Sequence, residues 1–246
     1  MSSIERLAQQ YRALRCHHIA AGLPDLLAQA EANELSYLQL AEQLVDLERQ
    51  GRERNRHTLN LRKAGFPAIK RLEEFDFRHQ TTITKRQVSQ LLDFRFLDER
   101  ANLVFIGPPG VGKTHLAIAI ALKAVEAGYK VLFTTALSLV ETLEIAELKG
   151  ELKKKIASLL KFDLLVVDEL GYLPMNRQGT YNLFQLINGL YEFRSGILTT
   201  NKDFTNWGEF LREDNVAVPI VDRLIHHSHV FMLGGESYRL KQKLAN

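Results

Sequence analysis

Short apolar runs alternate with helical segments from residue 100 onward. The runs are typical of buried strands at residues 103–106, 131–134, 164–167, 196–200 and 230–233. Helical periodicity is found at residues 114–127, which end before Gly128, and at residues 178–191. Apolar strands that alternate with helices predict an α/β fold, in which helices cover both faces of a parallel sheet.

The connection between the second and third predicted strands, residues 135–162, is unusually long. A crossover between parallel strands needs only about a dozen residues. Ser138 can cap a helix, Gly150 can break it, and residues 151–160 can form another. We therefore expect two helices in this crossover.

The N-terminal quarter of the chain has helical periodicity and predicts a small all-helical domain. Gly22-Leu23-Pro24 is expected to interrupt the first helical pattern, because proline lacks a backbone donor. Ser36 and Gln39 have the spacing of a capping box at the start of another helix.

A linker is expected at residues 63–67, which contain Gly65 and Pro67. A proline disfavours helix at the residue before it, so the helical pattern should end here. We place the domain boundary in this segment, with a helical N-terminal domain at residues 1–63 and a larger domain at residues 64–246.

The composition is that of an ordinary globular protein, since 46% of the 246 residues are hydrophobic and 25% are charged. No apolar run approaches the roughly 18 residues that would span a bilayer. The polar N-terminus lacks the apolar core of a secretory signal, and the single cysteine, Cys16, cannot form an internal disulfide. These features favour a cytoplasmic protein with no membrane partner.

The net charge of +3 is modest, but basic residues gather at residues 49–71. This segment has one acid, Glu53, against Arg49, Arg52, Arg54, Arg56, Arg62, Lys63, Lys70 and Arg71. Such a block is typical either of a solvated helix face or of an electrostatic footprint for nucleic acid. The segment by itself leaves both interpretations open.

The first predicted strand leads into a complete Walker A loop, a phosphate-binding motif. Its residues are Gly107, Pro108, Pro109, Gly110, Val111, Gly112, Lys113 and Thr114. The glycines let the backbone curl so that several N–H groups face one phosphate, and the following helix adds its positive dipole end. Lys113 is expected to reach the β- and γ-phosphates of ATP, and Thr114 to bind Mg²⁺. His115 directly follows Thr114, so we include it among the nucleotide-binding residues and expect it to have a structural role on that helix.

The third predicted strand ends in an acid pair, Asp168-Glu169, which has the pattern of a Walker B motif. In open α/β folds, ligands bind at the carboxyl edge of the sheet, where this pair would lie. Asp168 is expected to hold Mg²⁺, and Glu169 to orient and polarise the attacking water. Asn201 follows the fourth strand between the two motifs, and we expect it to contact the γ-phosphate or the lytic water.

Two arginines and two histidine groups are further candidates for chemistry. A guanidinium can stabilise the charge on a γ-phosphoryl group, in cis or from a neighbouring subunit. From spacing alone, however, Arg223 and Arg239 are ordinary surface arginines. His226-His227-Ser228-His229 and Cys16-His17-His18 suggest a metal, but neither has a second ligand cluster at zinc-site spacing, so no resident metal besides Mg²⁺ is expected.

These motifs and several later segments resemble those of the IstB family, the ATP-dependent helper proteins of insertion-sequence transposition. That family lies within the DnaC/DnaA-like branch of AAA+ ATPases, and the resemblance covers nearly the whole chain. It rests on Asn102-Leu103-Val104-Phe105-Ile106 with the Walker A loop, Thr114-His115-Leu116-Ala117, Asp168-Glu169-Leu170-Gly171-Tyr172-Leu173-Pro174, Thr199-Thr200-Asn201-Lys202, Asn206-Trp207-Gly208-Glu209, Asp222-Arg223-Leu224-Ile225-His226-His227 and Gly235-Glu236-Ser237-Tyr238-Arg239-Leu240. The Walker motifs alone are unspecific, whereas the later segments together are quite specific.

The resemblance implies an AAA+ sheet of five parallel strands in the order 5-1-4-3-2, with a reduced C-terminal helical lid. It implies that Arg223 is an arginine finger for the ATP of a neighbouring subunit, and that Arg239 is a sensor-2 arginine acting in cis. The extra helix in the crossover at 135–162 resembles the insertion of initiators and helicase loaders, which lines the nucleic-acid channel.

The function implied by the resemblance is that of an ATPase that assembles as a homo-oligomer on target double-stranded DNA. It would recruit and stimulate a cognate DDE-type transposase, and ATP hydrolysis would control assembly and release. The expected DNA contacts are Arg49, Arg52, Arg54, Arg56, Arg62, Lys63, Lys153 and Lys154, with Lys149 and Lys155 as further candidates.

The main alternative is a DnaC-like loader of a replicative helicase, which would have nearly the same ATPase core. Its N-terminal domain would then bind the helicase. A P-loop kinase for a small metabolite is disfavoured, because Asp168-Glu169 suits water activation and no signature of an acceptor pocket is found. A nucleotide-gated scaffold with negligible turnover is opposed by the complete set of catalytic positions.

Overall fold

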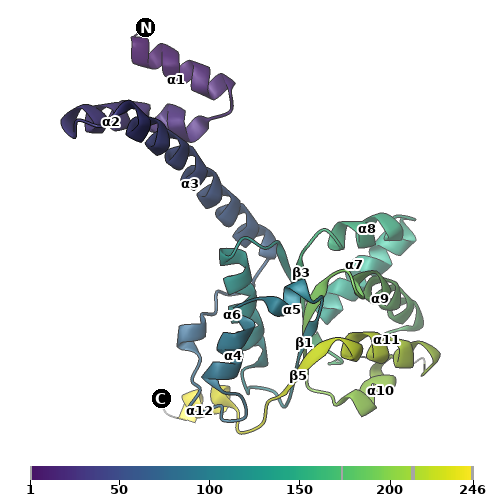
Figure 1. Cartoon of the computed structure of the whole chain (residues 1–246). Coiled ribbons are helices and arrows are strands. Elements are labelled where there is room, and N and C mark those ends of the chain that lie inside the picture. Colours follow the sequence, from purple (N-terminus) through teal and green to yellow (C-terminus); the bar gives the residue numbers. More distant parts are fainter. Residues whose placement is uncertain (1, 173, 212–213, 245–246) are drawn as a thin grey trace. The chain divides into compact units, whose positions relative to one another are not determined.

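The computed structural model describes residues 2–172, 174–211 and 214–244. The chain forms two compact units, Met1–Leu59 and Asn60–Asn246 (Figure 1). The division falls inside one continuous helix, α3 (Tyr37–Ala64). One helix therefore contributes residues to both units.

The N-terminal unit consists of α1 (Ser3–Ala13), α2 (His17–Ala32) and the first part of α3. Its apolar core is small. The buried residues are Ala8, Ala20 and Leu23, and the partly buried residues around them are Tyr11, Leu27 and Leu44. Because a small unit buries a low fraction of its surface, individual polar contacts carry more weight in its stability.

The expectation that Gly22-Leu23-Pro24 would interrupt the helix is wrong. The chain turns earlier, at Arg15, whose φ of 60° lies in the left-handed region, and α2 then continues through Pro24. Pro24 does remove one backbone donor from α2. Burial offsets this loss, because Leu23 is only 1% exposed and Gly22 lets α2 approach the side chain of Leu47 closely.

Both ends of α3 are well defined. The predicted capping box at its start is confirmed: Ser36 N donates to Gln39 Oε1 over 2.8 Å, and Gln39 N donates to Ser36 Oγ over 3.3 Å. At its other end the helix reaches Ala64, so the expected linker at residues 63–67 is partly helical. The helix continues this far because Ala64 is fully buried in the core of the second unit.

Glu48 is a buried carboxylate that joins α3 to α2. Its Oε2 accepts hydrogen bonds from the N–H groups of His18 (2.9 Å) and Ile19 (3.1 Å), and its Oε1 accepts from Arg52 Nε (2.8 Å). Burial acts to raise the pKa of Glu48, but these hydrogen bonds outweigh it and hold the pKa below its ordinary value. The carboxylate also lies at the N-terminus of α2, where the helix dipole favours negative charge.

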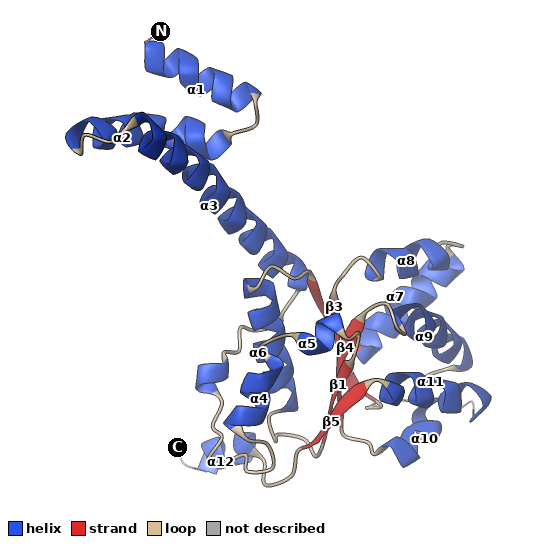
Figure 2. Ribbon diagram, viewed as in Figure 1, coloured by secondary structure: helices blue, strands red, loops and turns tan. Residues whose placement is uncertain are grey.

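The second unit contains a sheet of five parallel strands. The strands are β1 (Asn102–Ile106), β2 (Val131–Thr135), β3 (Leu164–Leu170), β4 (Ser195–Thr200) and β5 (Ser228–Met232). Their order in the sheet is β2-β3-β4-β1-β5, which confirms the predicted order 5-1-4-3-2. The succession β3-β4-β1-β5 can be followed in Figure 2.

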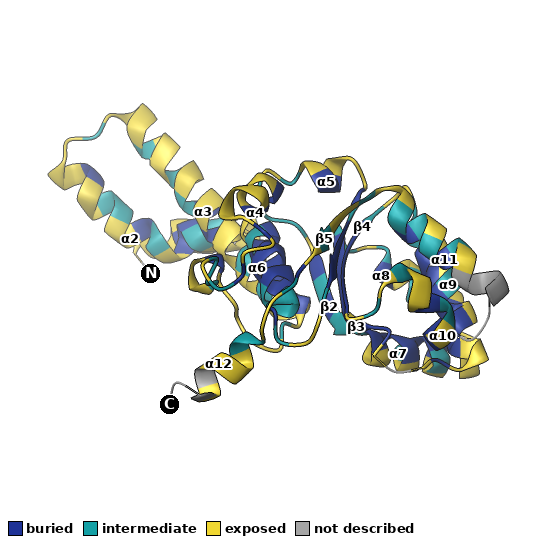
Figure 3. Ribbon diagram, turned by 90° about the horizontal axis from the view of Figure 1, so that it is seen from below, coloured by how far each residue is buried: buried dark blue, intermediate teal, exposed yellow. Residues whose placement is uncertain are grey.

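Helices cover both faces of this sheet (Figure 2). The core on one face involves α4 (Lys85–Leu91), α5 (Arg95–Asp98) and α6 (Lys113–Glu126). The core on the other involves α7 (Ala136–Leu148), α8 (Leu152–Leu159), α9 (Arg177–Leu190), α10 (Trp207–Leu211) and α11 (Asp214–His226). Alternate strand residues enter opposite cores, as Leu103 and Val104 do, so the inner strands β1, β3 and β4 are almost entirely buried, whereas the edge strand β5 is partly exposed (Figure 3).

The crossover between β2 and β3 holds two helices, α7 and α8, as predicted. Its capping residue was predicted wrongly. Thr135, rather than Ser138, is the N-cap of α7, and its Oγ1 accepts from the N–H of Ser138 over 3.2 Å. The helix begins before Ser138 because Thr135, the last residue of β2, has an extended backbone and its hydroxyl can accept from an N–H group of the first turn. Gly150 separates the two helices with a φ of 67°.

The segment between α3 and β1 contains more structure than the sequence indicated. It forms η1 (Leu72–Glu74), α4 and α5. Two further elements are η2 (Phe204–Asn206), which precedes α10, and α12 (Tyr238–Leu244), which follows β5. Phe66 is held by an edge contact with the ring of Phe133, with centroids 6.2 Å apart. The start of this segment is therefore packed against β2 of the sheet.

Glu48→Ala should lower the free energy of unfolding of the N-terminal unit by about 1 to 3 kcal/mol, because two N–H groups and Arg52 lose a charged acceptor. Thermal unfolding of the full chain, followed by circular dichroism, measures the change. Glu53→Ala, at an exposed position on the same helix, is the matched control and should change the value by less than about 0.5 kcal/mol.

The pH dependence has a definite sign. Because folding lowers the pKa of Glu48, its contribution is present above the ordinary value of 4.5 and is lost as the pH falls through the lower folded value. Equal effects of the two substitutions would contradict a special role for Glu48.

Candidate functional site

The Walker A loop, residues 107–114, follows β1 and runs into the first turn of α6, and the chain that follows β5 packs against it. A Cβ atom added to Gly107 would meet Leu233 O at 2.0 Å, and one added to Gly110 would meet Ser237 Oγ at 2.1 Å. Gly110 also has a φ of 85°. These positions require glycine both for the backbone conformation and for the close approach of neighbouring segments.

Lys113 is the first residue of α6, and its amine lies over the loop. Its Nζ donates to Gly107 O (2.7 Å) and to Pro108 O (2.8 Å). Burial lowers the pKa of Lys113, and the charge of Arg239 adds to this decrease, whereas Asp168 and Glu169 oppose it. Both predicted acids and Arg239 are thus close enough to act on the lysine electrostatically.

Thr114 and Asp168 meet although they come from different elements. The Oγ1 of Thr114 donates to Asp168 Oδ1 over 2.9 Å, and Asp168 is only 5% exposed. A hydroxyl and a carboxylate are oxygen ligands of the kind that Mg²⁺ prefers. This pair therefore fits the predicted magnesium site.

Glu169 follows within β3 and has an unusual backbone. Its φ is 61°, which is rare for a residue other than glycine, and its side chain is exposed. The pairing of β3 with β4 shifts between Val167 and Leu170, so the strand bulges at the acid pair. A bulge re-aims side chains, and here it leaves Asp168 buried while Glu169 faces a cavity.

Among the described residues, a smaller and a larger cavity adjoin the loop. The smaller, of about 60 Å³, brings together the predicted residues Lys113, Thr114, Glu169, Asn201 and Arg239. The larger, of about 450 Å³, is bounded by the loop, by residues 67–80 and by the start of α12. Its volume is within the range of pockets for small organic ligands.

Residues 67–80 are the part of this site that the sequence did not reveal. Gln80 is 3% exposed, and its Nε2 donates to Val111 O and Gly234 O over 3.0 Å each, which ties the segment to the loop. His79 packs edge-on against Tyr238, with centroids 5.2 Å apart. No short motif marks this segment, and only the fold brings it beside the loop.

His115 also faces the larger cavity. Its Nε2 lies 2.8 Å from Arg71 O, and its ring packs edge-on against Phe75. These contacts fit the structural role expected for His115.

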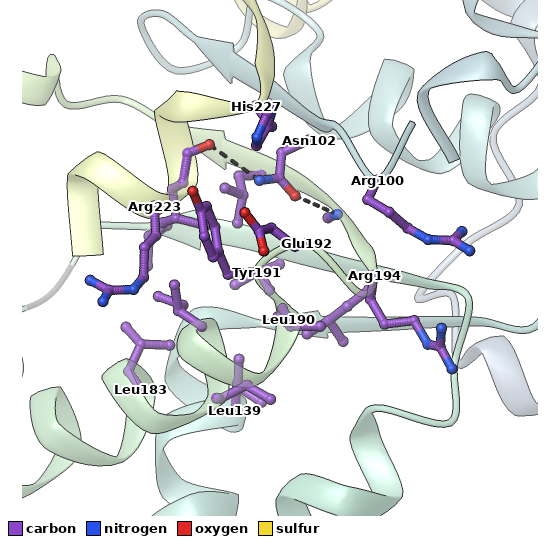
Figure 4. A pocket seen from close by; sticks show the side chains of 18 residues that line it. Arg100, Asn102, Leu139, Leu183, Leu190, Tyr191, Glu192, Arg194, Arg223 and His227 are labelled. Atoms are coloured by element: carbon purple, nitrogen blue, oxygen red, sulfur yellow. Dashed lines mark hydrogen bonds between the residues drawn. The ribbon is translucent and has the colours of Figure 1, made fainter. Parts of the chain in front are cut away.

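Arg223 lies apart from the loop, on α11. Its Nε donates to Asn188 Oδ1 over 3.1 Å, and its guanidinium carbon lies 5.3 Å from the centre of the Phe184 ring. It borders a third cavity of only about 30 Å³, room for about one water molecule. Figure 4 shows the guanidinium of Arg223 pointing away from this cavity. We assign no ligand to the third cavity.

The basic residues of α3 are exposed, but two of them have acidic partners. Arg49 pairs with Asp46 over 2.8 Å, and Arg52 pairs with Glu48. On α8, Lys153 and Lys154 are exposed, and Lys154 lies 3.5 Å from Glu151.

The histidine groups form no metal site among the residues that the structure describes. His226 instead lies 3.1 Å from the hydroxyl of Tyr191. Within the same described part of the chain, no helix combines the length and apolar character needed to cross a membrane.

A parallel sheet of this order, with a phosphate-binding loop after β1 and an acid pair on β3, defines the AAA+ class of P-loop ATP-binding proteins. Similar solved structures include AMPPCP-bound DnaA from Aquifex aeolicus, with a TM-score of 0.57 and 23% identity over 73% of this chain and 56% of that chain. The DnaC helicase loader has a TM-score of 0.53 and 23% identity over 60% of this chain and 86% of that chain. At such identity the likeness concerns the fold alone.

The chain belongs to the family of IstB-like ATP-binding proteins, whose model matches residues 9–246. It is 41% identical over 230 residues to the ATP-binding protein of insertion sequence IS21 from Pseudomonas aeruginosa, covering 94% of this chain and 87% of the relative. It is 36% identical over 239 residues to that of insertion sequence IS5376 from Geobacillus stearothermophilus, covering 97% and 95%. The resemblance inferred from the sequence is thereby confirmed.

Proposed function

We propose that this protein hydrolyses ATP to control its assembly on double-stranded DNA during transposition, where it recruits and stimulates a cognate DDE transposase. One observation carries the ATPase part: Lys113, Thr114, Glu169, Asn201 and Arg239 surround a single cavity. The transposition part rests on the family, because the relatives are ATP-binding proteins of insertion sequences.

The chemistry divides among the residues of the site. N–H groups of the Walker A loop and the amine of Lys113 bind the phosphates. Thr114 and Asp168 would hold Mg²⁺, which supplies positive charge to the β- and γ-phosphates. Glu169 orients and polarises the attacking water, and Asn201 holds that water or the γ-phosphate. Arg239 adds positive charge in cis, in keeping with its effect on the pKa of Lys113.

The larger cavity is the proposed site of the adenosine. It continues from the loop, where the phosphates would lie, towards Phe75, His79 and Tyr238. Aromatic side chains give a base the flat apolar surface on which it can stack. The cavity is therefore suited to the base end of a nucleotide.

Arg223 is proposed to act on a neighbouring subunit. It does not border either cavity beside the loop, although both cavities include Arg239. A half-buried guanidinium held by Asn188, the Pro219 carbonyl and the Phe184 ring is positioned on α11 to reach a γ-phosphate in another copy of the chain. Hydrolysis would then require a homo-oligomer.

DNA contacts are proposed for the basic residues of α3 and for Lys153 and Lys154. Such contacts to phosphates tolerate any sequence and weaken as salt rises. The helicase-loader alternative shares the fold, but the relatives at 36–41% identity belong to insertion sequences, which favours the transposition role.

Glu169→Gln should retain ATP binding, lose hydrolysis and stay on DNA, because the side chain no longer polarises water. Electron microscopy with a non-hydrolysable ATP analogue should show wild-type oligomers on DNA, and Glu169→Gln should form the same particles with ATP. Glu141→Gln, an exposed carboxylate on α7, is the control for charge loss, and Lys113→Ala should form no particles. Release of Glu169→Gln at the wild-type rate would contradict control by hydrolysis.

Arg223→Ala should lower DNA-stimulated hydrolysis by about 1,000-fold or more and leave nucleotide affinity within about two-fold. Mixing it with Glu169→Gln tests action in trans, because the Glu169→Gln subunit still offers Arg223 to an intact site. Hydrolysis should partly return in the mixture. Arg86→Ala, an exposed arginine on α4, is the control. Loss of nucleotide binding by Arg223→Ala would instead make it a cis residue.

Combined replacement of Arg54, Arg56 and Lys63 by alanine should reduce the slope of log affinity for DNA against log salt by about 3, since each lost phosphate contact contributes about 0.9. Fluorescence anisotropy with labelled duplex DNA measures the slope. Combined replacement of Arg78, Lys85 and Arg86, three exposed residues outside the proposed contacts, is the matched control. A slope equal to that of the wild type would remove α3 from the DNA interface.

A further inference from the structure

Thr199 stands opposite the acid pair in the sheet. It lies in β4 and is only 1% exposed. In the ladder between β3 and β4, Val167 pairs with Leu198 and Leu170 pairs with Thr200. Two residues of β3, Asp168 and Glu169, therefore face the single residue Thr199, which is the arrangement of a β-bulge.

The hydroxyl of Thr199 makes a hydrogen bond with each of these two residues. Its Oγ1 donates to Asp168 Oδ1 and accepts from the N–H of Glu169 over 3.0 Å. A hydroxyl has one proton to give and lone pairs to accept with, so both bonds can exist together. One side chain thus links the two residues proposed to hold Mg²⁺ and to orient water.

Each bond has its own physical effect. The φ of 61° at Glu169 is unfavourable for a residue other than glycine and persists only when its surroundings hold it. The bond from Glu169 N to Thr199 satisfies an N–H that the bulge takes out of the regular ladder. Asp168 Oδ1 accepts a hydrogen bond from Thr199 and another from Thr114. Two hydroxyl groups therefore orient this carboxylate.

We infer that Thr199 is a positioning residue for ATP hydrolysis, which acts by holding Asp168 and the backbone of Glu169 in their bulged arrangement. This inference rests on the proposed ATPase function. Thr199 acts on the rate through the two acids, because its one polar side-chain atom is already bonded to both of them. Although Thr199 borders the smaller cavity, its hydroxyl is engaged by Asp168 and Glu169, so nucleotide binding should depend on the loop and Lys113 instead.

Thr199→Val tests the inference, since valine has nearly the same shape and lacks the hydroxyl. It should lower kcat for DNA-stimulated hydrolysis by about 10- to 100-fold at saturating Mg²⁺ and leave KM for ATP within about two-fold. Thr199→Ser, which restores the hydroxyl, should return kcat to within about three-fold of the wild type. Thr180→Val, which also removes a buried hydroxyl with two hydrogen bonds, should keep the wild-type kcat.

The outcomes separate the two levels of the proposal. Absence of turnover in the wild-type protein would overturn the ATPase function, and the role of Thr199 with it. Turnover in the wild type with an unchanged kcat in Thr199→Val would overturn the role of Thr199 alone. So would a loss expressed mainly in KM, or a failure of serine to restore kcat. If Thr199→Val does not fold, Thr199→Ala is measured by the same criteria.

Discussion

Parallel pairing of β3, β4 and β1 is the constraint on which the site depends. Parallel strands end at the same edge of a sheet, so the order β3-β4-β1 places the acid pair, Asn201 and the Walker A loop side by side. Their residues are far apart along the chain, and no local interaction could gather them. The apolar strands β1, β3 and β4 therefore determine the positions of the acid pair, Asn201 and the Walker A loop.

Much of this arrangement could be predicted from the sequence, because it depends on local patterns. The apolar runs predicted the parallel sheet, and the glycines of the Walker A loop predicted the phosphate-binding site. The segments after the Walker motifs identified the family. The sequence did not reveal residues 67–80, whose place beside the loop depends on buried Gln80 bonding to Val111 and Gly234. Nor did it reveal the bulge at Glu169, which exists only through pairing with β4. At Pro24 the sequence predicted a break in the helix that does not occur. The burial of Leu23 in the N-terminal core outweighs the local preference of proline against a helix interior.

The N-terminal unit is stabilised in a different way. Its apolar core is small. The charged side chain of Glu48 adds to its stability by accepting hydrogen bonds from the N–H groups at the start of α2. The same α3 carries exposed arginines a few residues further on, so a single helix combines the structural acid with the residues proposed to contact DNA. Sequence periodicity alone does not distinguish the structural acid from its exposed neighbours, because both are charged residues of one polar helix.

The tight enclosure of the Walker A loop has a mechanical consequence. Tyr238 N donates to Gly110 O over 3.1 Å, and Ser237 fills the space beside the same glycine. Any movement of the loop would therefore act on the first turn of α12, which carries Arg239. This hydrogen bond and this contact at Gly110 tie the phosphate-binding loop directly to the helix that carries Arg239.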